Sequence, residues 1–138
     1  MKALMFGWEF PPHILGGLGT ASYGLTRGMW QCGDMDITFV IPKPWGDEDR
    51  SFANIIGASQ VPVAWRDPSR EYVESRIGNV MDPDLYFRLR SNIYADFNYM
   101  RTNDLGCIEF SGRYPDNLLE EINNYSIMAG VVARTLDF

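Results

Sequence analysis

Histidine and cysteine are scarce in this chain of 138 residues, and this scarcity limits the chemistry that it can carry. His13 is the single histidine, and the two cysteines, Cys32 and Cys107, are far apart and form no CxxC pair. A structural zinc ion is usually held by about four cysteine or histidine ligands at short spacings. No spacing of Ser, His and Asp, or of Cys and His, supports a nucleophilic triad either. We therefore expect two free thiols, no metal site and no cofactor.

Long apolar runs and blocks of basic residues are missing too. No apolar run approaches the length of about 18 residues that spans a membrane. Only six residues separate Met1 from Trp8, too few for the apolar segment of a signal peptide. The 12 basic residues are outnumbered by 18 acidic ones and do not cluster, so no footprint for a phosphate backbone is present. We expect a cytoplasmic protein that neither inserts into a membrane nor binds nucleic acid.

The first third of the chain carries a clear alternation of elements. The apolar run at residues 3–7 predicts a strand buried on both faces, as in a parallel sheet. Residues 36–41 are rich in β-branched side chains and predict a second strand, which Pro42 ends. Between them, Gly33 stands where a helix commonly ends, and apolar residues recur at helical spacing: Leu18, Ala21, Leu25 and Met29. This βαβ unit predicts an α/β fold, a Rossmann-like, doubly wound and mostly parallel sheet with helices on both faces.

The signals after residue 42 are weaker. Residues 42–68 predict a surface loop, within which Pro62 would allow residues 60–65 to form only an edge strand. The acidic run at 47–49 is expected to be solvated, with capture of a metal ion as the alternative. Apolar residues at steps of four predict a helix over 84–100: Leu85, Leu89, Ile93 and Phe97. Residues 107–110 are too few to assign.

The last element predicted is a helix that begins after Asn117. Asn117 and Glu120 have the spacing of a capping box. Its apolar positions follow a period of about 3.6 residues: Leu118, Ile122, Tyr125, Ala129, Val132 and Leu136. The chain ends where such a helix would lead into another strand, so we expect the native chain to continue.

Three glycines in four positions, Gly16, Gly17 and Gly19, raise the question of function. Glycines at a helix start permit either a tight turn with close packing or the close approach of an anion to the helix N-terminus. The segment 17–22 reads G-x-G-x-x-S, one residue away from the dinucleotide fingerprint. However, nine residues separate Gly7 from Gly17, and no carboxylate ends the second strand to hold a ribose. A nicotinamide-dependent oxidoreductase is therefore the weaker alternative.

The stretch GWEFPPHILGGLGTASYGLTRGM, residues 7–29, resembles the opening of retaining glycosyltransferases of the GT-B fold, particularly those like glycogen and starch synthases. The shared pattern is a strand, then E-x-P-P, three variable residues, and G-G-L-G at a helix start. The resemblance covers residues 2–42. Ile14 departs from it, because the starch and bacterial glycogen synthases have a lysine two residues before the glycine pair.

The resemblance implies a role for each matching residue. It implies that Gly16, Gly17, Leu18 and Gly19 bind the diphosphate of a nucleotide-sugar donor. Glu9 and His13 would face the cleft on the acceptor side. No catalytic residue is implied within the chain.

The resemblance also implies what the whole protein does. Residues 1–138 would be the N-terminal, acceptor-side, Rossmann-like domain, and the C-terminal nucleotide-sugar domain lies outside this sequence. The reaction would transfer a hexosyl unit, with glucosyl the first expectation, from an ADP- or UDP-hexose to a glycan acceptor with retention. The fragment alone would be inactive. A non-catalytic, stand-alone Rossmann-like binding module is the alternative.

Overall fold

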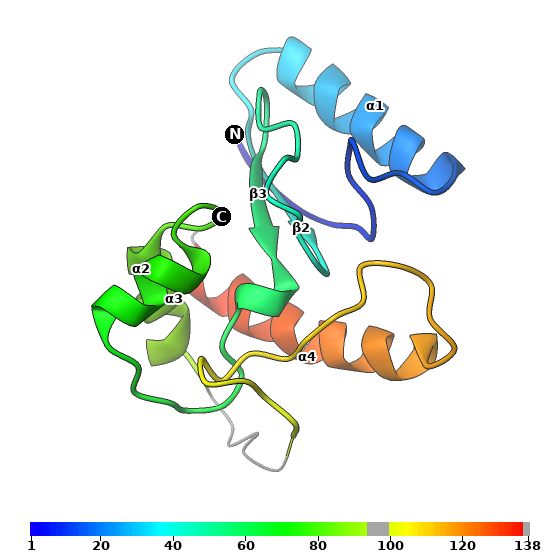
Figure 1. The fold of residues 1–138 in the computed structure, drawn as a ribbon. Helices are drawn as coiled ribbons and strands as arrows, with labels where there is room; N and C mark the ends of the chain where they lie inside the picture. Colours follow the sequence, from blue (N-terminus) through cyan, green and yellow to red (C-terminus); the bar gives the residue numbers. More distant parts are fainter. Residues whose placement is uncertain (94–99, 137–138) are drawn as a thin grey trace.

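The computed structural model describes residues 1–93 and 100–136 and has an α/β fold built on a three-stranded parallel sheet (Figure 1). The elements in chain order are β1 (Lys2–Phe6), α1 (Gly17–Gln31), β2 (Asp36–Ile41), β3 (Asn54–Gly57), the 3₁₀ turn η1 (Ala58–Gln60), α2 (Arg70–Ile77), α3 (Pro83–Ser91) and α4 (Leu118–Thr135). The βαβ unit predicted for the first third is confirmed. None of the helices in these two ranges is long and apolar enough to cross a membrane.

The strands lie in the order β1-β2-β3, which places β2 in the centre. Leu4 lies opposite Thr38, and Val40 lies opposite Ile56. The prediction that the first strand is buried on both faces is wrong: both of its ends are exposed, and Phe6 keeps 43% of its surface. Its middle residues are half-buried, because Leu4 packs against one apolar cluster of the sheet and Ala3 and Met5 pack against the other.

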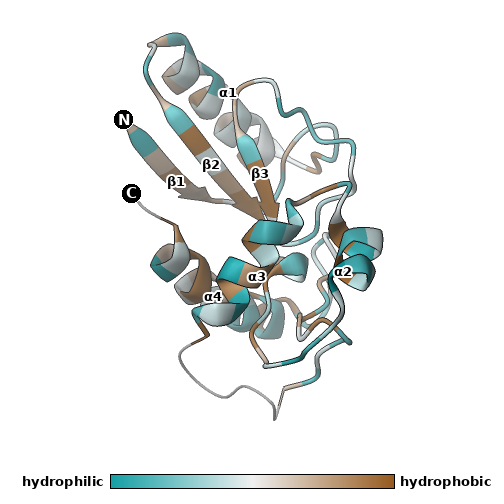
Figure 2. Ribbon diagram, turned by 90° about the vertical axis from the view of Figure 1, so that its left-hand side faces the viewer, coloured by the Kyte–Doolittle hydropathy of each residue, from teal (hydrophilic) through white to brown (hydrophobic). Residues whose placement is uncertain are grey.

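Apolar side chains on the two faces of the sheet form separate clusters. Phe39 and Ile55 belong to the cluster that Tyr23 and Met29 of α1 cover. Val40 and Ile56 belong to the larger cluster, to which α2, α3 and α4 contribute: Val73, Ile77, Tyr86, Leu89, Met128, Val131 and Val132. Figure 2 shows the hydrophobic strands between α1 and the other helices. Helices therefore cover both faces of this small sheet.

Helix α1 packs on the sheet with a face that shares only Met29 with the predicted apolar stripe. Leu18 and Leu25 of the predicted apolar stripe are 60% and 58% exposed. The packed face carries Gly19 and Thr26, and the Thr26 hydroxyl donates a hydrogen bond to the Ser22 carbonyl at 2.7 Å. Small or internally bonded side chains allow this face to lie close to the strands. Gly33 follows the helix with a φ of +82°, as predicted for the residue that ends it.

The surface loop predicted over residues 42–68 is wrong for its second half. It contains β3 and a buried segment in which Val61, Val63 and Ala64 have no exposed surface. The strand considered over 60–65 is absent, because Pro62 makes only an isolated bridge with Cys107. The amides of Val63 and Ala64 instead donate to the Gly106 carbonyl. Long-range packing, not a sheet, buries this segment.

The helices of the second half differ from their predictions at their ends. Helix α3 ends at Ser91, not at residue 100, because the Asn92 side chain bonds the Arg88 carbonyl at 3.0 Å and closes the last turn. Phe97 lies outside the described residues. The short helix α2 was not predicted.

Helix α4 begins directly after Asn117, as predicted, but the capping box is wrong. The Asn117 side chain makes no capping hydrogen bond, and Glu120 is exposed. Glu121 is buried instead and accepts hydrogen bonds from the amide and the hydroxyl of Ser111, at 2.9 and 3.1 Å. Ile122 of the predicted stripe is 45% exposed. Both cysteines are free thiols, as predicted.

Candidate functional site

The candidate site lies where β1 and β2 end and their loops meet. In open parallel sheets, ligands bind outside the carboxyl ends of the strands. The two loops are joined by a hydrogen bond of 3.1 Å from the Asp49 amide to the Pro11 carbonyl. Tyr125 of α4 fixes the strand ends, because its hydroxyl lies 2.9 Å from the Gly7 carbonyl and 2.8 Å from the Val40 carbonyl. The ends of β1 and β2 and the Tyr125 side chain of α4 therefore fix the position of the site.

The three glycines of the loop have different surroundings. A Cβ atom on Gly19 would lie 2.7 Å from Glu9 Oε2, so Gly19 is required by packing against Glu9. Gly16 and Gly17 are exposed, and a Cβ atom on either would meet nothing within 4 Å. Gly16 has a φ of −165°, an extended conformation open to any residue. Neither backbone torsion nor packing within the described chain explains glycine at these two positions.

The N-terminus of α1 is open at this point. Gly16 caps the helix without a side chain, and the first turn contains no acidic residue. Leu18, which follows, is 60% exposed. The first amides of a helix have no partner within it and carry a partial positive charge. This end of α1 is therefore suited to an anion that approaches from outside.

Glu9 packs against Gly19 and also lines a small cavity. Its side chain is 4% exposed, and neither carboxylate oxygen accepts a hydrogen bond of standard geometry from the residues described. The phenol of Tyr114, on the loop before α4, interacts with the Glu9 carboxylate. Burial, and then the neighbouring Glu9 carboxylate, raise the pKa of the Tyr114 phenol above its usual value. Glu9 is thus a buried acid that packs against the first turn of α1.

His13 is paired with a residue that the sequence did not connect to it. Its Nε2 lies 2.7 Å from Asp47 Oδ1, and its ring packs against Trp45 with the ring centres 4.9 Å apart. The Lys43 ammonium lies 4.4 Å from the centre of the same Trp45 ring. His13 and Asp47 side chains are 39% and 60% exposed, so this pair faces solvent.

The acidic run at 47–49 is not uniformly solvated, in contrast to the prediction. Glu48 is 6% exposed, and its carboxylate accepts hydrogen bonds from the amides of Trp45 and Gly46, at 2.5 and 3.0 Å. Asp49 accepts a hydrogen bond of 2.7 Å from the Tyr23 hydroxyl. Together with the Asp47–His13 pair, all three acids therefore bind groups of their own chain.

A cavity of about 10 Å³ gathers these groups. It is lined by Trp8, Glu9, Phe10, His13, Ile41, Lys43, Trp45, Glu48 and Gly112. The structure thus brings Glu9 and His13 together, with Lys43, Trp45 and Glu48, which sequence reasoning did not assign to the site. Gly16, Gly17 and Gly19 do not line the cavity. Gly19 packs against Glu9, which does.

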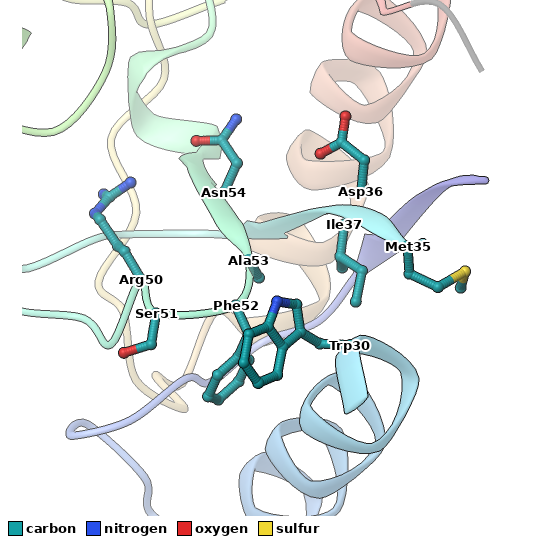
Figure 3. A pocket seen from close by; sticks show the side chains of 9 residues that line it. All are labelled: Trp30, Met35, Asp36, Ile37, Arg50, Ser51, Phe52, Ala53 and Asn54. Carbon is teal, nitrogen blue, oxygen red and sulfur yellow. The ribbon is translucent and has the colours of Figure 1, made fainter. Parts of the chain in front are cut away.

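A larger pocket, of about 400 Å³, lies at the opposite end of the sheet, where β2 and β3 begin (Figure 3). Trp30 and Phe52 pack together on one side of it, with ring centres 5.9 Å apart. Asp36 and Asn54 point away from these two rings. Because its polar groups do not converge, this pocket is the weaker candidate.

Comparison of the chain with protein-family models, with curated proteins and with solved structures returned no match. The geometry of the site and the motif at residues 7–29 are therefore the features that point to a function.

Proposed function

We propose that this chain is the N-terminal, acceptor-side domain of a GT-B fold, retaining glycosyltransferase similar to glycogen synthase. It would transfer a hexosyl unit, glucosyl by first choice, from an ADP- or UDP-hexose to a glycan acceptor. The observation that supports this most is that Gly16 and Gly17 are open and serve no torsion or contact of their own chain. Side chains there would obstruct only a ligand that approaches the start of α1.

The chemistry of such a transfer matches what this end of α1 offers. Negative charge develops on the leaving diphosphate as the glycosidic bond breaks, and amide groups aimed at it stabilise the transition state. The amides of Leu18 and Gly19, in the first turn of α1, would supply these groups. Glu9 and His13 would line the acceptor side of the same cleft. The full doubly wound sheet and the donor-binding second domain belong to this proposal, and residues 1–138 alone would turn over no substrate.

The test compares two glycine substitutions in α1 by NMR titration of the chain with UDP, with ADP and with NAD. Wild type should shift the amide signals of residues 16–19 with a nucleoside diphosphate. Gly17→Ala should weaken this binding at least about tenfold, a loss of about 1.4 kcal/mol. The matched control is Gly24→Ala, in the exposed middle of the same helix, where a Cβ atom also meets nothing within 4 Å. Equal binding by the two variants would contradict the proposed donor site.

A stand-alone anion-binding module is the second candidate, and Ile14 favours it. This residue occupies the place of the phosphate-contacting lysine in the synthases that the chain resembles. Its Cγ2 would lie 3.1 Å from a Cβ atom on Gly19, so it packs against the helix start and offers no charge. Binding of inorganic phosphate as tight as that of a nucleoside diphosphate would support this candidate. A thermal shift with NAD alone would instead indicate the oxidoreductase.

A further inference from the structure

The loops after β1 and β2 bring one imidazole and two carboxylates together. One nitrogen of His13 and one oxygen each of Asp47 and Glu48 all lie within 4.8 Å of one another. Ligand atoms bound to a single zinc ion at about 2.1 Å are at most about 4.2 Å apart. Movements of about half an ångström would therefore place all three atoms around one ion. His13 and Asp47 are 34 residues apart, and no sequence pattern connects them.

A second observation, independent of this cluster, points to a bound cation. Glu9 lines the same cavity as His13 and Glu48, is 4% exposed and has two oxygens without a hydrogen-bond partner of standard geometry among the described residues. The Tyr114 phenol is the neighbouring group that interacts with this carboxylate. A nearby cation would further offset the cost of removing the carboxylate from water.

The charge and the size of the cavity fit a single small ion. Three carboxylates, Glu9, Asp47 and Glu48, lie in or beside the cavity with one ammonium, that of Lys43. Lys43 is held over the Trp45 ring at 4.4 Å, and with a neutral His13 the groups retain a negative formal charge. The volume of about 10 Å³ holds about one water-sized particle.

We propose that His13, Asp47 and Glu48 bind a divalent cation, Zn²⁺ or Mn²⁺, between the loops that follow β1 and β2, and that the buried Glu9 carboxylate adds negative charge from the same cavity. Imidazole favours Zn²⁺ and carboxylates favour Mn²⁺, and the set contains no thiolate. The ion takes the place of the proton between His13 Nε2 and Asp47 Oδ1. Glu48 keeps lone pairs for it, because its two oxygens accept one amide hydrogen bond each.

The single histidine makes the test direct, because the Hε1 proton of the His13 imidazole gives the one histidine Hε1 signal of the NMR spectrum. Mn²⁺, added below one equivalent to the 138-residue chain, should broaden this signal before the other signals of the spectrum. Zn²⁺ should bind at one site in calorimetry, and Asp47→Asn should weaken that binding at least about tenfold.

The matched control is Asp34→Asn, which neutralises an exposed acid at the amino end of β2 and should leave Zn²⁺ binding unchanged. Asp47 is 60% exposed, so its variant should fold, and a native amide spectrum verifies this. If Mn²⁺ broadens the His13 signal no more than the others, or if Asp47→Asn binds Zn²⁺ as tightly as wild type, the proposal is wrong. Neither readout uses a sugar nucleotide, so its failure would leave the proposed function untouched.

Discussion

Gly19 and Gly24 are two glycines of one helix with opposite surroundings. The Cβ position of Gly19 is 2.7 Å from Glu9 Oε2 and 2.9 Å from Glu9 Cβ, whereas that of Gly24 meets nothing within 4 Å. Both positions are helical, so the difference between them is one of packing. Packing therefore requires glycine at position 19 of α1, whereas alanine would fit at position 24.

Gly19→Ala should lower the free energy of unfolding by about 1–3 kcal/mol, because the added methyl group overlaps a buried side chain. Gly24→Ala should raise it by about 0.4–1 kcal/mol, because alanine reduces the conformational freedom of the unfolded chain. Urea unfolding of both variants at neutral pH measures these changes. Equal effects of the two substitutions would mean that Glu9 can move aside without cost.

Some residues of the candidate site could be predicted from the sequence and others could not. Glu9 and His13 were found because they belong to a motif whose members are close in the chain. Asp47 lies 34 residues from His13, and Tyr114 lies on a third segment beside Glu9. No periodicity or spacing connects these segments, because only the folded chain brings them together.

Helices α3 and α4 both start after a residue type that commonly caps helices, but only the first of these residues caps its helix with its side chain. Asp82 precedes Pro83, and its side chain accepts a hydrogen bond from the Asp84 amide. Asn117 also stands at the residue before a helix, but its side chain makes no capping bond. The amide of Leu118 donates to the Pro115 carbonyl instead. The preceding turn thus supplies the partner of the first helical amide of α4, and the Asn117 side chain caps none of the following amides.

Asp82→Ala should therefore destabilise the protein by about 1 kcal/mol, since it removes an acceptor from the start of α3. Asn117→Ala should change the free energy of unfolding by less than about 0.5 kcal/mol, since no capping bond is lost. Thermal unfolding of both variants under one condition gives the comparison. A larger loss in Asn117→Ala than in Asp82→Ala would show that the Asn117 side chain caps α4 in solution.

The elements that the sequence predicted well are those that local signals define. The first two strands and α1 are bounded by Gly33 and Pro42, and α4 has a long apolar period. Strand β3 has four residues, too few for a pattern, and residues 61–64 are buried by contacts with the chain near Gly106. The packed face of α1 was predicted wrongly because the leucines of the stripe face solvent while Thr26, which bonds internally, faces the sheet.

Across the molecule, buried phenol groups connect the helices to the sheet and to the long loops. Tyr125 of α4 bonds the ends of β1 and β2, and Tyr86 of α3 donates a hydrogen bond of 2.7 Å to the Leu105 carbonyl. Burial raises the pKa of both phenols well above their usual range. Burial also raises the pKa of the Cys107 thiol. The fold therefore favours the uncharged form of three groups in its interior.

This preference predicts a loss of stability at alkaline pH. The pKa of Tyr125 is higher in the folded chain than the value of about 10 in the unfolded chain. The free energy of unfolding that this phenol contributes is therefore fully present below about pH 10 and is lost as the pH rises above it. The melting temperature should thus fall steeply between about pH 9.5 and about pH 11. Tyr125→Phe should lower stability at pH 7 by about 1 kcal/mol, because two strand-end carbonyls lose a donor. The melting temperature of the same variant should fall less steeply with rising pH than that of wild type, because the variant lacks one phenol whose pKa is raised by folding. An identical slope in wild type and Tyr125→Phe would locate the alkaline sensitivity in groups other than this phenol.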